Sequence, residues 1–174
     1  MIFPLAADRM AWKDNSPFNR ETPEMKAQYL LAAAFFVAAG LSYALGYTPL
    51  LLVCLLLLMS LITYGFYAKD KAAAIRGDWR IPEKTLHGLS LCGGWPGALI
   101  AQQRLRHKTK KVSFRVVFWL TVLVNVTAFA WLHGPEGKNQ LRNSVFHLEN
   151  LALTEIPSSQ AVSLVLYLIQ YRSQ

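Results

Sequence analysis

The sequence predicts an all-α polytopic membrane protein with three transmembrane helices and a broken helical hairpin that is re-entrant or interfacial. The chain has 174 residues, of which 53% are hydrophobic and 16% are charged, whereas about a quarter of a soluble domain is usually charged. Charged side chains are absent from residues 27–68, 85–103 and 116–135. These features exclude an ordinary soluble globule, and the length predicts about one domain.

The excess of basic residues is confined to one segment. The formal net charge of the chain is +8. Residues 69–115 hold eleven Lys and Arg but only three Asp and Glu, so this segment alone has a net charge of +8, and residues 1–26 and 116–174 are each neutral. A basic excess in one connecting segment is typical of a cytoplasmic loop. We therefore expect this loop in the cytoplasm.

The chain begins with a mixed-charge leader, residues 1–26, which we also expect in the cytoplasm because a two-helix hairpin returns the chain to the same side. The first helix is predicted over about residues 27–47. Thr22 suits the N-cap of this helix and Pro23 its first position. Its apolar part of about twenty residues matches the thickness of the hydrocarbon core.

The second helix is predicted over about residues 49–68, after a tight turn that ends at Pro49. Aromatic residues lie at its end, and Lys69 and Lys71 follow directly. Aromatic side chains flanked by lysines anchor a helix at the cytoplasmic boundary of a membrane. The basic loop therefore begins at this boundary.

The third apolar segment, about residues 82–106, is interrupted. Pro82 and Glu83 suit a helix start, but the motif Gly93-Gly94-Trp95-Pro96-Gly97 follows. Proline removes a backbone donor and glycine loosens the backbone, so we do not expect one continuous helix. The segment is either a broken span or a hairpin that enters the membrane and returns.

Charge favours the hairpin. If the segment crossed the membrane, residues 69–84 and 104–115, with five and six basic residues, would lie on opposite sides. The positive-inside rule disfavours that arrangement. We therefore predict a re-entrant or interfacial hairpin whose irregular backbone is covered by the other helices.

The last predicted membrane helix covers about residues 113–132 and completes a membrane domain over 27–133. Asn125 and Thr127 are polar positions within it, and we expect them to bond to a neighbouring helix. Residues 134–174 form a polar tail with a short uncharged stretch near its end. That stretch is too short to span and is expected to be an interfacial or packing helix.

Four motifs stand in the order found in one protein family: Tyr67-Ala68-Lys69-Asp70-Lys71-Ala72, Arg80-Ile81-Pro82-Glu83-Lys84-Thr85-Leu86, Gly93-Gly94-Trp95-Pro96-Gly97-Ala98, and Arg106-His107-Lys108-Thr109-Lys110-Lys111 with Phe114. Over about residues 49–132 the chain resembles the uncharacterised bacterial membrane-protein family called domain of unknown function 1294. The resemblance implies the bacterial inner (plasma) membrane and little chemistry, because the family is not established as enzymatic.

Some members of that family carry an N-terminal cold-shock domain, which binds nucleic acid. The 26-residue leader is too short for such a barrel and shows no strand alternation with exposed aromatics. We therefore expect no nucleic-acid binding by this route. The basic loop also lacks the interleaved aromatics on which single strands stack.

The densest cluster of charge is the candidate anion site. It consists of Arg104, Arg106, His107, Lys108, Lys110 and Lys111. Fixed cations near a membrane attract phosphates, so these residues are candidates for binding anionic lipid headgroups. The plainer interpretation is that they only hold the loop in the cytoplasm.

Asp70 lies between two lysines at the end of the second predicted helix. It is either a carboxylate that pairs with an arginine of 104–115 and takes part in acid–base chemistry, or an ordinary interfacial ion pair. No recognised metal-ligand or nucleophile spacing joins it to the nearby His87, Cys92 or His107, so no metal or cofactor is predicted. His87, beside apolar positions, is expected to be packed.

The glycine motif at 93–97 also has two interpretations. Backbone groups exposed at a helix break bind ions or headgroups in transporters with discontinuous helices. The plainer interpretation, which we favour, is a tight hairpin turn with Trp95 at the membrane interface. Outside the glycine motif, the other motif residues expected to have a structural or functional role are Lys69, Lys71, Arg80, Pro82 and Glu83.

Two functional hypotheses follow from the sequence. In the first, the protein is a non-enzymatic inner-membrane protein whose basic hairpin contacts anionic lipid headgroups or a partner membrane protein. In the second, it is an enzyme or transporter for a phosphorylated or lipidic small molecule that uses Asp70 with Arg106 and His107. The absence of a catalytic pattern favours the first hypothesis.

Overall fold

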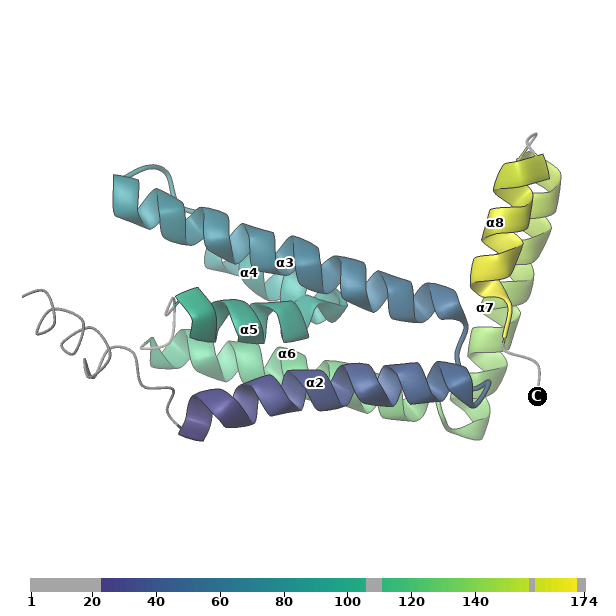
Figure 1. Ribbon diagram of the computed structural model, residues 1–174, viewed down its shortest axis with the longest axis horizontal. Helices are drawn as coiled ribbons and strands as arrows, with labels where there is room; N and C mark the ends of the chain where they lie inside the picture. Colours follow the sequence, from purple (N-terminus) through teal and green to yellow (C-terminus); the bar gives the residue numbers. More distant parts are fainter. Residues whose placement is uncertain (1–22, 106–110, 157–158, 172–174) are drawn as a thin grey trace, which may run out of the picture.

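The computed structural model describes residues 23–105, 111–156 and 159–171, and all regular structure in these ranges is helical. Three helices are long and apolar enough to cross a membrane: α2 (Pro23–Ala44), α3 (Leu50–Arg76) and α6 (Val112–Trp131). All three run along the length of the bundle, and the shorter α5 (Trp95–Leu105) contacts each of them (Figure 1). The all-α class and the three membrane-length helices are therefore confirmed.

The helix ends agree with the sequence at most positions, but α3 is longer than expected. Helix α2 begins at Pro23, and α6 begins at Val112, one residue before the predicted start. Helix α3 continues to Arg76, past the predicted end at residue 68. The end of the helix was predicted from the end of its apolar run. The helix continues beyond that point because lysine and the alanines that follow it are good helix formers.

The third apolar segment is a broken helical hairpin. Helix α4 (Glu83–Leu89) is followed by one wide turn, η1 (Ser90–Gly94), and then by α5. Within the turn, Cys92 and Gly93 leave helical geometry, and Gly93 adopts a φ of 94°. Residues with a Cβ rarely adopt that conformation. The predicted interruption at the glycine motif is therefore confirmed.

Contacts with α3 give the directions of the two arms of the hairpin. The backbone N–H of Ile81, just before α4, donates to Asp70 near the end of α3 (3.0 Å), whereas η1 packs against the middle of α3. Helix α5 then runs back parallel to α3, because Gly97 lies against Ser60 and the Gln102 side-chain amide contacts the Tyr67 hydroxyl (3.4 Å). Both arms therefore meet the same end of the bundle (Figure 1), which confirms the hairpin.

The core of the bundle is built around Trp95, which is fully buried. Its ring lies edge-on to Phe35 of α2, with ring centroids 4.8 Å apart, and Phe35 in turn contacts Phe129 of α6 (5.2 Å). The expectation that Trp95 lies at the membrane interface is wrong. The break in the hairpin turns this side chain inward, where α2, α3 and α6 meet around α5.

Helix α6 supplies hydrogen-bond donors to the irregular backbone at the hairpin turn. Asn125 of α6 donates from Nδ2 to the carbonyls of Ser90 (3.3 Å) and Leu91 (3.1 Å), which lie at the break. These bonds satisfy acceptors that a continuous helix would have used. The expected interhelical bond of Asn125 is thus confirmed, whereas Thr127 is exposed on the outer side of α6.

Two further helices follow the bundle. Helix α7 (Pro135–Glu155) and helix α8 (Ser159–Ile169) pack against each other and lie across the end of the bundle (Figure 1). Helix α8 corresponds to the predicted short apolar helix and also contacts α3. The polar composition of residues 134–174 concealed the long α7, although Leu141, Val145, Leu148 and Ala152 recur at helical spacing.

Candidate functional site

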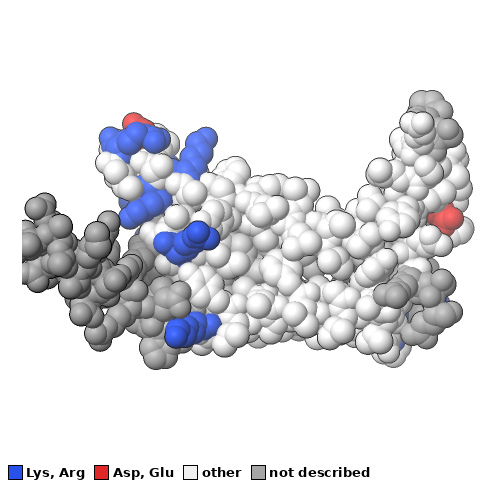
Figure 2. All heavy atoms as spheres, viewed as in Figure 1, with Lys and Arg blue, Asp and Glu red and all other residues white. Residues whose placement is uncertain are grey.

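The basic residues gather at one end of the bundle, where α3 and α5 end and α4 and α6 begin. Figure 2 shows Lys and Arg grouped at this end, with an uncharged surface along the middle of the bundle. We call it the basic end and define it by the described cations Lys69, Lys71, Arg76, Arg80, Lys84, Arg104, Lys111 and Arg115. Lys26, near the start of α2, lies at the same end.

Each acidic residue of segment 69–115 is engaged by a neighbouring cation. Asp70 lies 3.8 Å from the Arg80 guanidinium. Asp78 pairs with Arg76 (2.7 Å) and Glu83 pairs with Lys111 (2.8 Å). The last two pairs are largely exposed, so each contributes at most about 1 kcal/mol to stability. Because the described part of the basic end holds eight cations and only these three acids, it keeps an excess of positive charge after the pairing.

Asp70 is the most buried charged group at the basic end, with no exposed surface. One carboxylate oxygen, Oδ1, accepts the backbone N–H of Ile81 (3.0 Å) and faces the Arg80 Nε. These contacts attach the loop after α3 to the last turns of that helix. A buried carboxylate needs such partners, because an uncompensated buried charge is strongly unfavourable. The observed contacts are those of a structural group that positions the hairpin.

A polar and aromatic layer lies beneath Asp70. Tyr67, one turn earlier on α3, is fully buried, and its hydroxyl contacts Gln102 of α5. His87 of α4 packs against the ring of Phe114, with centroids 4.3 Å apart. The expectation that His87 is a packed histidine is confirmed. This layer joins α3, α4, α5 and α6 just inside the basic end.

An exposed tryptophan at the basic end was missed in the sequence. Trp79, in the loop between α3 and α4, is 94% exposed, and Ile75 on the last turn of α3 is 73% exposed. Both lie among Arg76, Arg80 and Lys71. Tryptophan flanked by basic residues is typical of a membrane–water interface. Its position beside Gly77, Asp78 and Arg80 was the available indication in the sequence.

The structure places only part of the candidate anion site. Arg104 is exposed at the end of α5, and Lys111 is exposed next to the start of α6. Arg106, His107, Lys108 and Lys110 lie outside the described residues. The cluster therefore stays a prediction, although its two described members both lie at the basic end.

The predicted motif residues divide into two groups. Lys69, Arg80 and Pro82 are exposed at the basic end, and Lys71 and Glu83 are half-buried there. In contrast, the motif Gly93-Gly94-Trp95-Pro96-Gly97 is buried throughout. A methyl group added at Gly97 would overlap the backbone of Ser60, and one at Gly94 would overlap the Thr63 hydroxyl. These contacts support a packing role for the motif, since small residues allow close approach of helices in lipid.

The described part of the basic end contains no evident metal centre. Within residues 23–105, 111–156 and 159–171, no three His, Cys, Asp or Glu side chains lie close enough together to hold a metal ion. Cys54 and Cys92 are both free and exposed on the bundle surface. The described part of the basic end is thus a cationic surface over a buried polar layer.

These features define a class of small helical protein with three membrane-length helices, a broken helical hairpin and one basic end. The family described as "Protein of unknown function (DUF1294)" matches residues 60–114, a range that contains all four motifs. "Uncharacterized protein YsdA" of Bacillus subtilis (strain 168) is 28% identical over 86 residues, which cover 49% of this chain and 97% of that relative. The resemblance to this family is confirmed, over a shorter segment than 49–132. No solved structure gives a significant match.

Proposed function

We propose that the protein is an integral protein of the bacterial inner membrane whose basic end faces the cytoplasm. Helices α2, α3 and α6 then cross the bilayer, and the α4–α5 hairpin enters and leaves on the cytoplasmic side. The charge distribution supports this orientation, because the whole net charge of +8 belongs to segment 69–115 and basic loops stay in the cytoplasm. Helices α7 and α8 are then outside.

We further propose that the basic end binds anionic lipid headgroups. The supporting observation is that all three acidic residues of the segment are engaged with cations, while Lys69, Lys84, Arg104 and Arg115 present exposed charge. Exposed Trp79 adds a side chain suited to the headgroup layer. Each basic residue near an anionic surface contributes roughly 1 kcal/mol of attraction, which salt screens.

Lipid selectivity in a reconstituted bilayer tests this function. The protein is placed in mixed phosphatidylcholine and phosphatidylglycerol, and the preference of its boundary layer is measured with spin-labelled lipids. We expect phosphatidylglycerol to be preferred, and the preference to fall severalfold in the variant K69E/K84E/R104E. Added salt should also reduce the preference, because the attraction is electrostatic.

A charge-conserving variant is the matched control for this measurement. K69R/K84R/R104K changes the same three side chains without changing their charge, so it should retain the wild-type preference. If charge reversal leaves lipid selectivity unchanged, the headgroup proposal is wrong. Loss of a co-purifying membrane protein in that case would instead support the partner-protein interpretation of the same surface.

A further inference from the structure

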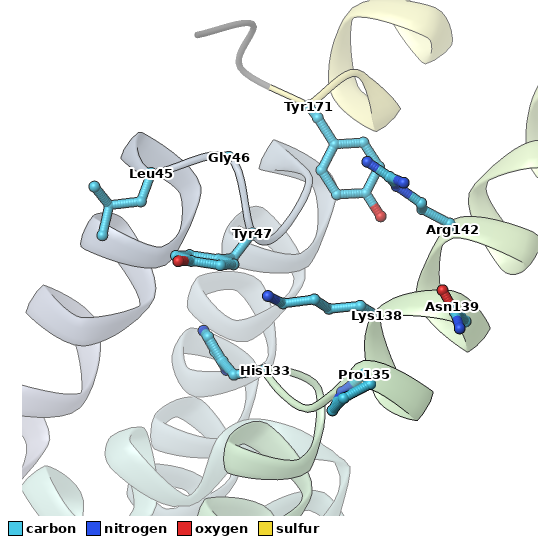
Figure 3. Close-up of a pocket in the computed structure, with 9 residues that line it drawn as sticks. All are labelled: Leu45, Gly46, Tyr47, His133, Pro135, Lys138, Asn139, Arg142 and Tyr171. Atoms are coloured by element: carbon cyan, nitrogen blue, oxygen red, sulfur yellow. The ribbon is translucent and has the colours of Figure 1, made fainter.

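The end of the bundle opposite the basic end contains a pocket with a volume of about 600 Å³. Three separate parts of the chain surround it (Figure 3): the α2–α3 turn with Tyr47, the connection from α6 into α7 with His133, and Tyr171 after α8. Pockets of this size hold small organic molecules. The pocket shares no residue with the basic end.

The charge of the pocket is positive. Lys138 and Arg142 lie one turn apart on α7, and both line the pocket, whereas Asp and Glu are absent from the described residues that line it. Like charges at this spacing on a helix repel each other. The Lys138 ammonium is held 4.3 Å from the centroid of the Tyr47 ring, a cation–π contact that fixes its position at the pocket. An anion between the two cations would offset their repulsion.

On one wall of the pocket the polar side chains already have hydrogen-bond partners, which makes this wall rigid. The ring of His133 makes hydrogen bonds through both nitrogens, Nδ1 with the carbonyl of Phe129 (2.9 Å) and Nε2 with the hydroxyl of Ser42 (2.9 Å). Ser42 also bonds to Thr48 in the α2–α3 turn (3.0 Å). This network holds α2, α3 and α6 together below the pocket, so His133 is a wall of the site and not a free ligand.

The opposite wall offers an unused donor. The hydroxyl oxygen of Tyr171 is buried and has no hydrogen-bond partner within the described part of the chain. Burial raises the pKa of this hydroxyl above its usual value of 10.0, and the nearby Arg142 only partly offsets that rise. The hydroxyl therefore keeps its proton at neutral pH. Because the hydroxyl has almost no accessible surface, a ligand in the pocket reaches it only when the Tyr171 ring turns toward the pocket. Such a turn is favourable, since a buried donor without a partner is unfavourable unless a ligand accepts from it.

We propose that this pocket binds the phosphate group of an organic phosphate, with Arg142 and Lys138 pairing with its oxygens and Tyr171 donating a hydrogen bond. Two cations and a hydroxyl donor match an anion with several charged oxygens. The volume of the pocket also exceeds the needs of an inorganic ion and leaves room for the organic part. Two sources share this chemistry, a phospholipid headgroup and a soluble phosphate ester.

The test uses the full-length protein in phosphatidylcholine nanodiscs. Binding of sn-glycerol 3-phosphate is followed by titration calorimetry, and phosphatidylglycerol is added to the discs in a separate arm, followed by the thermal unfolding midpoint. We expect R142Q to weaken binding at least about tenfold, because a charge-assisted hydrogen bond contributes more than one factor of ten. E149Q changes an exposed charge on α7 that does not line the pocket, so this variant should bind both probes like the wild type.

A second variant keeps the test decisive if R142Q is poorly folded. Y171F removes only the unpartnered hydroxyl, so without ligand it should be as stable as the wild type or more stable. With ligand it should bind severalfold more weakly. Weakened glycerol phosphate binding in both variants would support a soluble ester, and loss of stabilisation by phosphatidylglycerol alone would support a lipid headgroup. If neither probe binds, or both variants bind like the wild type, the proposal is wrong.

Discussion

Replacing Gly97 with alanine is expected to destabilise the bundle by roughly 1–3 kcal/mol. The added methyl group would overlap the backbone carbonyl of Ser60, so α5 and α3 would have to move apart. Backbone atoms yield less readily than the end of a flexible side chain. Because α5 contacts α2, α3 and α6, the displacement would disturb the packing of the whole bundle. The measurement is unfolding by denaturing detergent, together with the amount of protein in the membrane fraction.

Gly65 provides the matched control for that substitution. It lies on the same helix as Ser60, and a methyl group added there would meet no atom within 4 Å. Gly65→Ala should leave stability unchanged or raise it by up to about 1 kcal/mol, since alanine is the better helix former. Equal stability of the two variants would show that the close contact of α5 with α3 is not as described.

Replacing Asp70 with alanine is the second change with a large expected effect. Its side chain is fully buried and accepts the backbone N–H of Ile81, so alanine leaves that donor without its acceptor. We expect a loss of about 3 kcal/mol, between the cost of one unsatisfied donor and that of a broken buried ion pair. Asp70→Asn keeps a carbonyl oxygen at the site and should lose less. Membrane abundance and detergent-unfolding midpoints measure both effects.

Asp78 is the control for the role of Asp70. It forms the exposed pair with Arg76, so Asp78→Ala should change stability by less than about 0.5 kcal/mol. If Asp70→Asn instead leaves abundance and stability intact while abolishing a cellular activity of the protein, the structural account of Asp70 is wrong. That result would favour the enzyme or transporter hypothesis.

The path of the chain through the bundle could be predicted from the sequence because two simple properties determine it. Long apolar runs gave α2, α3 and α6, and the distribution of lysine and arginine favoured a hairpin over a crossing for residues 85–103. The inward position of Trp95 could not be predicted in this way. Tryptophan suits both an interface and a core, and only the geometry of the break around Gly93 decides between them.

Helix α7 and the pocket were also not predicted from the sequence. Residues 135–155 are polar overall, and this composition outweighed the helical spacing of Leu141, Val145, Leu148 and Ala152, which was the available signal for α7. Lys138, Tyr47 and Tyr171 are far apart in the chain, so no spacing joins them. Similarly, the pairing of each acidic residue at the basic end depends on loops whose course the composition does not determine.

Labelling of single cysteines from one side of the membrane tests the central claim most directly. Cys54 and Cys92 are first replaced with alanine, and one cysteine is then introduced at Lys84, Ser113 or Ser144, all of which are exposed. Lys84 precedes the main part of the hairpin, Ser113 follows it, and Ser144 lies on α7 at the other end of the bundle. Spheroplasts are treated with a membrane-impermeant maleimide before and after lysis.

A re-entrant hairpin with a cytoplasmic basic end predicts one pattern of labelling. Cysteines at Lys84 and Ser113 should both be protected in intact spheroplasts and react only after lysis, whereas the cysteine at Ser144 should react in both conditions. Labelling of the Lys84 and Ser113 positions from opposite sides would mean that residues 85–103 cross the membrane. That result would contradict the account.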